Sequence, residues 1–172
     1  MRDKNVLPKI MVSACLLGEP TRYDGGNMKV HHPVLEQWIQ QGMIISFCPE
    51  VEGGLITPRP PAEIINGDGT HVLDGDVKVL DINGQDVTQP YKLGASKALQ
   101  VAQKNGVGLG ILKAQSPSCG SQMIYDGTFS MTLKPGKGVT AALLERNGIR
   151  VFNEDEIDAA ADYLTNLTLS IP

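Results

Sequence analysis

The sequence contains little cysteine, few aromatic residues and no long apolar run. Aromatic residues make up 5% of its 172 residues, and only 3 residues are cysteine. No segment approaches the roughly 20 consecutive apolar residues that a membrane-spanning helix needs. The apolar run after the charged N-terminus is short and contains Pro8 and Ser13, which is typical of a first strand and not of a signal peptide. We therefore expect a soluble, cytoplasmic protein with no contact to a membrane.

An excess of positive charge is also absent. The chain carries 15 basic and 19 acidic residues, for a net charge of -4. Long nucleic acids and anionic membrane surfaces select a basic face, so neither is expected as the main partner. Hydrophobic residues at 41% and charged residues at 20% match an ordinary globular protein. This length suits one core, and we expect a single α/β domain over residues 1–172.

The spacing of the three cysteines excludes several common cysteine frameworks. An odd number cannot pair completely in disulfides, and a reducing compartment would keep Cys15, Cys48 and Cys119 as thiols. No C-x-x-C pair occurs, so the spacing matches neither a zinc ribbon nor a ferredoxin. The cysteines are then either three separate buried residues or the parts of one site.

One pattern occurs three times and predicts the fold. A segment with helical periodicity ends at a glycine, and an apolar run follows directly. The helices are expected at 33–41, 93–105 and 138–147, and the apolar runs at 43–47, 107–112 and 149–152. With 9–14 as a first strand, four parallel strands alternate with helices. This alternation is typical of a three-layer α/β fold with a mostly parallel, Rossmann-like sheet.

Shorter features complete the predicted fold. A last helix is expected from Asn153, with Glu156 completing a capping box. The Gly-, Pro- and Asp-rich segment 52–88 predicts a hairpin-like excursion over the mouth of the sheet, with a short extended piece at 71–73. Residues 125–129 predict a second, smaller hairpin.

Each cysteine follows a predicted strand. Cys15 comes directly after the first strand, Cys48 directly after the second, and Cys119 lies in the loop after the third. The carboxyl ends of parallel strands share one edge of an open α/β sheet, where ligands bind. We therefore expect the three thiols to meet there, although a single free cysteine is more often a buried packing residue.

Three thiolates select a soft, electron-accepting partner, which means zinc, copper(I) or an iron–sulfur cluster. Ligands this far apart in the sequence suit a bulky cluster better than a single ion. A cube held by three thiolates leaves one iron open, and that iron can act as a Lewis acid. A three-cysteine zinc enzyme remains an alternative, as does a non-catalytic sensor whose cluster or thiols report oxygen.

Polar residues suited to chemistry stand near the cysteines. They are Ser13, Asp24, Glu50, Ser116 and Ser118. Each also has a purely structural alternative, since Glu50 could be a surface carboxylate or a helix cap and the others could hydrogen-bond in turns. Arg59 and Glu63 could form a structural ion pair.

A set of short motifs spans nearly the whole chain. They are Ser-Ala-Cys-Leu-Leu-Gly at 13–18, Arg-Tyr-Asp-Gly at 22–25, Cys-Pro-Glu at 48–50, Gly-Gly-Leu at 53–55, Pro-Arg-Pro-Pro-Ala-Glu at 58–63, Ser-Pro-Ser-Cys-Gly at 116–120, Tyr-Asp-Gly-Thr-Phe at 125–129 and Gly-Val-Thr-Ala-Ala-Leu-Leu at 138–144. In this combination and order the sequence resembles the 2-thiouracil desulfidase family, also described as a bacterial domain of unknown function (number 523).

The resemblance implies a cofactor and a reaction. Characterised members hold a [4Fe–4S] cluster on three cysteines and convert 2-thiouracil into uracil and sulfide without net redox change. The resemblance makes Cys15, Cys48 and Cys119 the cluster ligands, with one iron open for the sulfur of the substrate. The implied partner is a small thio-base. If a homodimer forms, we expect the contact at an exposed face around Trp38 or at the last helix.

The resemblance also implies catalytic roles. It makes Glu50 the catalytic acid/base and Ser116 a catalytic serine, with Ser118 as the alternative serine. Three polar residues are expected to position the substrate, namely Ser13, Asp24 and Ser118.

Overall fold

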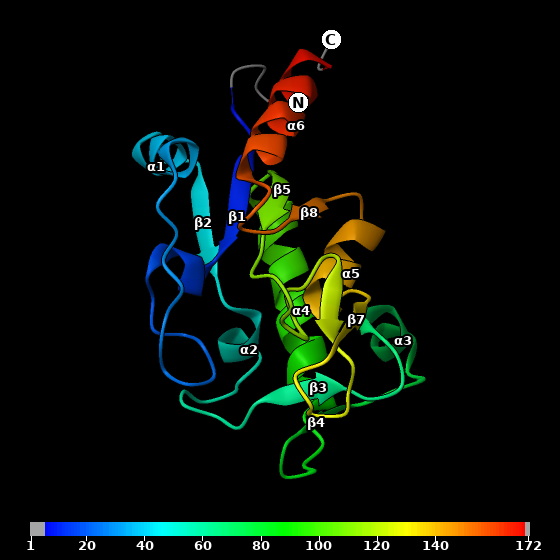
Figure 1. Cartoon of the computed structure of the whole chain (residues 1–172). Coiled ribbons are helices and arrows are strands. Elements are labelled where there is room, and N and C mark those ends of the chain that lie inside the picture. The colour runs from blue at the N-terminus through cyan, green and yellow to red at the C-terminus, as the bar shows by residue number, and fades with distance from the viewer. Residues whose placement is uncertain (1–5, 171–172) are drawn as a thin grey trace.

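Four parallel strands form the central sheet of the protein. The structure is a computed structural model, and it describes residues 6–170. The strands run side by side in the order β2–β1–β5–β8, as Figure 1 shows. They are β1 (Lys9–Ser13), β2 (Ile44–Phe47), β5 (Val107–Ile111) and β8 (Arg150–Phe152). The predicted α/β fold with four parallel strands is confirmed.

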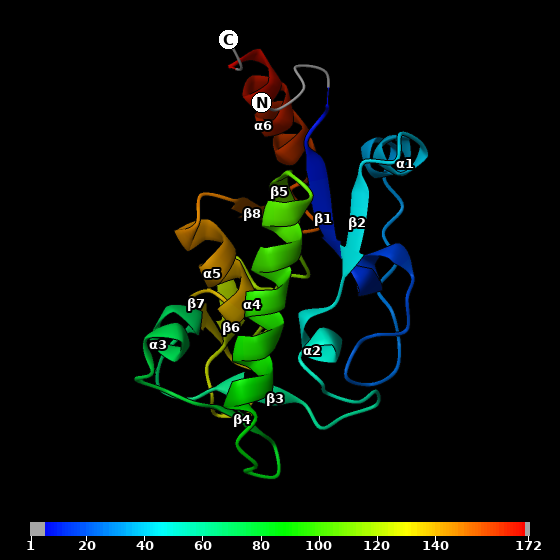
Figure 2. The same ribbon diagram turned by 180° about the vertical axis from the view of Figure 1, so that it is seen from behind.

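Helices cover both faces of this sheet and give three layers. The helices on one face are α1 (Pro33–Gln40) and α6 (Ile157–Leu169), and those on the other are α4 (Thr88–Lys104) and α5 (Val139–Arg146). Figure 2 shows α4 and α5 in front of the sheet. Side chains alternate along β1, so Ile10 and Val12 pack with the first layer and Met11 with the second. None of the described helices is both long and apolar enough to cross a membrane.

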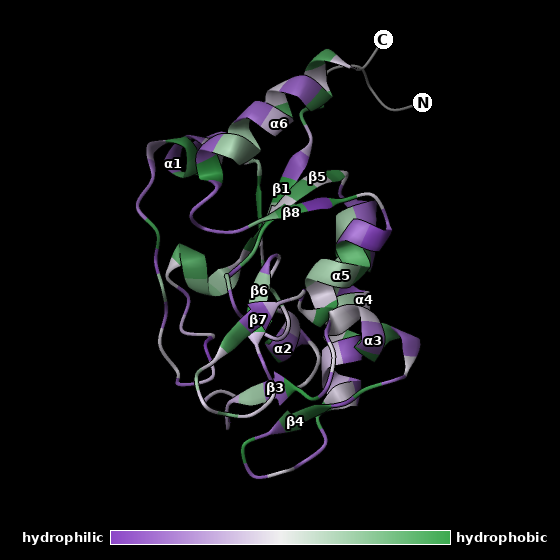
Figure 3. Ribbon diagram, turned by 45° about the vertical axis from the view of Figure 1, so that its right-hand side comes forward, coloured by the Kyte–Doolittle hydropathy of each residue, from purple (hydrophilic) through white to green (hydrophobic). Residues whose placement is uncertain are grey.

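Burial of apolar side chains holds the layers together. Leu35 and Trp38 of α1 belong to one buried cluster with Ile10 and Leu109 of the sheet. Each such side chain contributes about 1.5–3 kcal/mol when it leaves water. Figure 3 shows that hydrophobic and hydrophilic residues alternate along α6. Trp38 is only 5% exposed, so the expectation that its side chain is exposed is wrong, while a homodimer stays a prediction.

Glycines end the helices where the sequence predicts. Gly42, Gly106 and Gly148 have φ angles of 66°, 65° and 80°. A residue with a side chain is strained in this left-handed region, whereas glycine adopts it at little cost. The chain can therefore leave each helix and enter the next strand within a short turn.

Two small antiparallel sheets correspond to the expected hairpins. They pair β3 (Ala62–Ile64) with β4 (Val79–Asp81), and β6 (Met123–Tyr125) with β7 (Leu133–Pro135). The prediction of an extended piece at 71–73 is wrong, because these residues lie in α3 (Gly69–Asp74). The Asp68 carboxylate accepts hydrogen bonds from the N–H groups of Thr70 and His71, and this cap favours a helix there.

Two other helices begin at different residues than predicted. α4 begins at Thr88 and not near 93. Its first turn accommodates Pro90, because backbone N–H groups in the first turn of a helix have no partner within the helix, so proline breaks no hydrogen bond there. α6 begins at Ile157 and not at Asn153. The Asn153 N–H does bond to the side chain of Glu156, at 3.0 Å, but this contact stabilises the turn before the helix.

Candidate functional site

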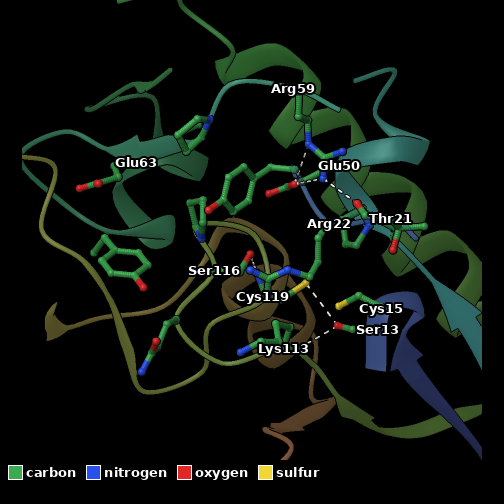
Figure 4. Close-up of a pocket in the computed structure, with 18 of the residues that line it drawn as sticks. Ser13, Cys15, Thr21, Arg22, Glu50, Arg59, Glu63, Lys113, Ser116 and Cys119 are labelled. Atoms are coloured by element: carbon green, nitrogen blue, oxygen red, sulfur yellow. Dashed lines mark hydrogen bonds and ion pairs between the residues drawn. The ribbon is translucent and has the colours of Figure 1, made fainter. Parts of the chain in front are cut away.

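A cavity of about 490 Å³ opens at the carboxyl edge of the central sheet. Its lining combines residues that directly follow β1, β2 and β5 with residues from loops that cross this edge. Figure 4 shows side chains from these separate parts of the chain gathered around the same space. The cavity therefore lies at the sheet edge where the sequence analysis expects a site.

All three cysteines line this cavity as free thiols. Cys15 lies in the short 3-10 helix η1 (Ala14–Leu17) directly after β1. Cys48 follows β2 and precedes the one-turn helix α2 (Pro49–Glu52). Cys15 and Cys119 are buried, and Cys48 is half-buried. Positions far apart in the sequence thus meet because three parallel strands end at the same edge.

The thiols are held in a setting that opposes their ionisation. Burial raises the pKa of Cys15 to about 11 and the pKa of Cys119 to about 12. Loss of solvation also raises the pKa of Cys48. The proximity of Cys48 raises both other pKa values further, because neighbouring negative charges repel. A bound metal group would lower these pKa values and favour the thiolates, because it supplies positive charge.

Hydroxyl groups surround the sulfur of Cys119. Ser13 Oγ donates a hydrogen bond to Cys119 Sγ at 3.5 Å and accepts one from the Lys113 N–H at 2.9 Å. The Cys119 thiol lies 3.7 Å from Ser118 Oγ, which in turn contacts Thr140 Oγ1 at 3.3 Å. Ser13 therefore connects the end of β1 to the end of β5 and to one of the cysteines.

Ser116 shapes the loop that carries Cys119. Its Oγ accepts hydrogen bonds from the N–H groups of Ser118 at 3.1 Å and of Cys119 at 3.2 Å. Ser116 itself lines the cavity. Since its oxygen accepts both bonds, its hydroxyl proton stays free for a further donation.

Two of the predicted substrate-binding residues are not part of the cavity lining. Ser118 is 1% exposed, and its hydroxyl contacts the Cys119 thiol. Asp24 accepts a hydrogen bond from the Gly26 N–H at 2.9 Å and forms an ion pair with Arg22 at 3.5 Å. The Gly26 hydrogen bond is the main reason that the pKa of Asp24 is lowered. In this structure, the side chains of both residues therefore contact neighbouring residues of the protein and do not face the cavity.

Glu50 is held from two sides inside the cavity. Its Oε2 forms an ion pair with the Arg59 guanidinium, whose Nε donates at 3.0 Å, and its Oε1 accepts from the Tyr91 hydroxyl at 2.7 Å. The side chains of Glu50 and Arg59 are 13% and 6% exposed. This half-buried carboxylate, bound on both oxygens, is not a free surface group, which excludes one of the structural alternatives for Glu50.

The expected ion pair between Arg59 and Glu63 is wrong. Arg59 binds Glu50, and its Nη2, which takes part in that ion pair, also donates to the carbonyl of Thr21 at 2.9 Å. The Glu63 carboxylate instead accepts backbone N–H groups of the loop between β6 and β7. The short sequence distance between the two residues suggested a pair, but β3 directs Glu63 away from Arg59.

Sequence analysis missed Tyr91 and Glu154. Tyr91 lies on α4, 41 positions from Glu50, and is 4% exposed. Burial, followed by the charge of Glu50, raises the pKa of Tyr91 well above its usual value, so the phenol remains a hydrogen-bond donor. Glu154 holds Lys113 Nζ at 2.6 Å and the Ala114 N–H at 2.7 Å. No local pattern marks either residue, because each works through a contact with a distant part of the chain.

The model of a family described as 2-thiouracil desulfurase matches residues 10–156. The chain belongs to this family. The matched region contains the three cysteines, Glu50 and Ser116. Membership in the 2-thiouracil desulfurase family confirms the resemblance on which the sequence analysis relied.

Two further similarities cover most of the chain. A protein of Bacillus subtilis (strain 168), described as the uncharacterized protein YbbK, is 44% identical over 149 residues, which are 87% of this chain and 97% of that protein. A solved structure described as the [4Fe–4S]-dependent thiouracil desulfidase TudS is 43% identical, with a TM-score of 0.84. That match covers 92% of this chain and 98% of the other, and it confirms the α/β fold.

The donor set of this desulfurase-family chain fits an iron–sulfur cluster. Three free thiols face one cavity, and thiolates are the ligands that such clusters use. The raised thiol pKa values mean that a cationic group would stabilise all three positions at once.

Much of the remaining cavity wall is apolar or aromatic. It includes Tyr23, Met28, Phe47, Ile82, Tyr125, Phe129 and Met131. A wall of this kind suits a flat heteroaromatic ring, because apolar faces bind the ring while a few polar groups fix its orientation.

Proposed function

We propose that this protein is a [4Fe–4S]-dependent desulfidase that converts a thiocarbonyl compound such as 2-thiouracil into uracil and sulfide. The observation that carries the proposal is the cavity itself, where three thiols and a half-buried carboxylate held by Arg59 and Tyr91 line the same space. Membership in the 2-thiouracil desulfurase family supports it, as does the similarity to the desulfidase TudS.

In this proposal Cys15, Cys48 and Cys119 would hold the cluster, because their thiols line the same cavity. When bound, the cluster supplies a Lewis-acidic iron that takes the thiocarbonyl sulfur and makes the carbon beside it more electrophilic. The lining residues opposite the cysteines then orient the ring and exclude bulk water.

Glu50 is the general base of the proposed reaction. Arg59 and Tyr91 fix the direction of its carboxylate. Oε2 accepts from both Nε and Nη2 of Arg59, whereas Oε1 accepts the Tyr91 hydroxyl and keeps a lone pair that can accept a proton from water. The water oxygen forms a bond to the thiocarbonyl carbon, the C–S bond breaks, and the electron pair leaves with sulfur as sulfide. Carbon exchanges sulfur for oxygen, so the reaction needs no oxidant or reductant.

Serine hydroxyls complete the proposed site. Ser116 keeps a free proton that can be donated to the ring or to the oxygen that enters. Ser13 contacts the thiol of Cys119 and reaches the cavity, where it can position the substrate. The roles predicted for Ser118 and Asp24 would have to be indirect, through Cys119 and Arg22.

Anaerobic reconstitution with iron and sulfide, followed by addition of 2-thiouracil, tests the function. We expect brown protein with broad absorption near ~400 nm and equal amounts of uracil and sulfide. Colourless protein that is active with zinc alone would support the zinc alternative. Cluster-loaded protein that releases no sulfide from any thio-base would support the sensor.

A further inference from the structure

Glu63 is a buried carboxylate that the proposed reaction does not use. It lies on β3, is 8% exposed and borders the cavity. Its Oε1 accepts hydrogen bonds from the N–H groups of Gly127 at 2.9 Å and of Phe129 at 3.2 Å. Figure 4 shows the carboxylate pointing away from Cys15 and Cys119. Glu63 therefore acts on the protein backbone and not on the reacting atoms.

The two N–H groups belong to the hairpin tip, residues 126–132, which joins β6 to β7. Phe129 and Met131 in this tip have φ angles of 57° and 60°, a conformation that side chains disfavour. The other hydrogen bonds of the tip run within it, as between Thr128 and Ser130 at 2.6 Å. Among the described residues, the hydrogen bonds that join the tip to another element are the two to Glu63.

The hairpin tip also forms part of the cavity wall. Phe129 and Met131 both line the cavity, although Met131 is 85% exposed. Gly127 lies so close to β3 that an added Cβ would be 2.6 Å from the carbonyl oxygen of Ile64. The position of this wall thus depends on close contact between the tip and β3.

We propose that Glu63 is a positioning residue that holds the hairpin tip against β3 and so fixes the wall formed by Phe129 and Met131. A strained tip with two fewer anchoring hydrogen bonds would relax away from the cavity. In the proposed reaction this wall contacts the substrate ring and not the reacting sulfur. Glu63 therefore controls the affinity for the ring and the selection among rings of different shape. This kinetic consequence rests on the proposed function, whereas the anchoring of the tip does not.

Kinetics with two substrates test the effect on the wall. In Glu63→Ala, we expect the KM for 2-thiouracil to rise about tenfold, with kcat changed less than about twofold, because ground-state and transition-state contacts are lost equally. For a thiouracil with an alkyl chain on the ring, the KM should rise less, since the displaced wall leaves room for the chain. Glu63→Gln keeps an oxygen acceptor for both N–H groups and should restore the wild-type KM to within about threefold.

Hydrogen exchange tests the anchor without any turnover. In cluster-free protein, the amides of Gly127 and Phe129 should be protected in the wild type and in Glu63→Gln, and exchange faster in Glu63→Ala. Gly127→Ala provides a second route, since it pushes the tip off β3 while Glu63 is intact. Asp68→Ala is the matched control, because its carboxylate also binds backbone N–H groups, including Lys137 at 3.3 Å, but lies outside the cavity.

The outcomes separate the two proposals. Unchanged exchange at the tip in Glu63→Ala, or an unchanged KM in folded, cluster-loaded Glu63→Ala, would overturn the positioning role. An equal rise in KM in Asp68→Ala would overturn it too, since general destabilisation would then explain the effect. Absence of sulfide release by the wild type would refute the proposed function alone, and the exchange data would still decide the anchor.

Discussion

At the scale of single residues, the environment of Glu50 connects structure to mechanism. Arg59 reaches it from a loop 9 positions away, and Tyr91 reaches it from α4, 41 positions away. A carboxylate held at both oxygens cannot rotate freely, so a water molecule between it and the ring meets a fixed acceptor. The proposed base is thus positioned before the substrate arrives.

Tyr91→Phe should therefore lower kcat without loss of the cluster. The substitution keeps the ring but removes the 2.7 Å hydrogen bond to Oε1, and a bond to a charged group is worth about 1.5–3 kcal/mol, or roughly tenfold or more in rate. Glu50→Gln should lower kcat further, by about a hundredfold or more, because it removes the base itself. Sulfide release and iron content, measured on the same samples, check both variants. Wild-type rates in Glu50→Gln would refute the role of Glu50.

The thiols of the cluster-free protein should react slowly and in a pH-dependent manner. Only the thiolate reacts with iodoacetamide, and pKa values of about 11 for Cys15 and about 12 for Cys119 leave few thiolates near pH 8. We expect alkylation on the order of a hundredfold slower than for a free cysteine, with rates that rise as the pH approaches 11. Mass spectrometry of each cysteine over a pH series measures this. Rapid alkylation of Cys119 at pH 7 would contradict the raised pKa.

At the scale of elements, two helices meet backbone to backbone and bring Glu50 to Tyr91. An added Cβ on Gly94 of α4 would lie 1.9 Å from the carbonyl oxygen of Pro49, at the start of α2. An added Cβ on Gly53 would lie 2.1 Å from the carbonyl oxygen of Pro90. Both glycines therefore permit an approach that any side chain would prevent.

Gly94→Ala should destabilise the protein and weaken the site together. In an exposed helix this change stabilises by up to about 1 kcal/mol, but here the clash involves backbone that cannot move aside cheaply, and we expect a loss of about 1–3 kcal/mol. Urea unfolding of the cluster-free protein measures the free energy of unfolding, and sulfide release reports the site. Ser96→Ala, at an exposed position of the same helix, is the control and should change neither. Equal stability of both variants would show that α2 and α4 tolerate separation.

At the scale of the whole molecule, the layered fold turns distant sequence positions into one site. β1, β2 and β5 are neighbours in the sheet, and their carboxyl ends present Cys15, Cys48 and the loop with Cys119 to the same cavity. The helices on both faces pack against the strands and bury most of β1 and β5. Cluster binding at this edge would therefore link three segments of the chain.

A bound cluster should stabilise the entire fold. A ligand that binds the folded state alone adds about 2.7 kcal/mol when it is present at a hundred times its Kd. We expect a higher Tm for reconstituted than for cluster-free protein, measured anaerobically by circular dichroism. In Cys15→Ala, Cys48→Ala or Cys119→Ala, reconstitution should raise the Tm little. A full rise in any of these variants would remove that cysteine from the proposed ligand set.

The sequence by itself determined the elements and the cysteine positions. Apolar runs and helix-ending glycines are local patterns, so they were sufficient to predict four parallel strands with Cys15 and Cys48 at their ends. Local signals were less reliable where capping competes with periodicity, as at His71, which lies in a helix because of the Asp68 cap.

Only the tertiary structure decided the partners of the site residues. From the sequence, Glu50 could be a surface group and Arg59 could pair with Glu63, but the packing of α2, α4 and β3 gives each of them a different partner. Tyr91 had no signal in the sequence at all. The physical reason is that such contacts depend on how separate elements pack, and hydrogen bonds over 41 or 64 positions are not encoded by any local pattern.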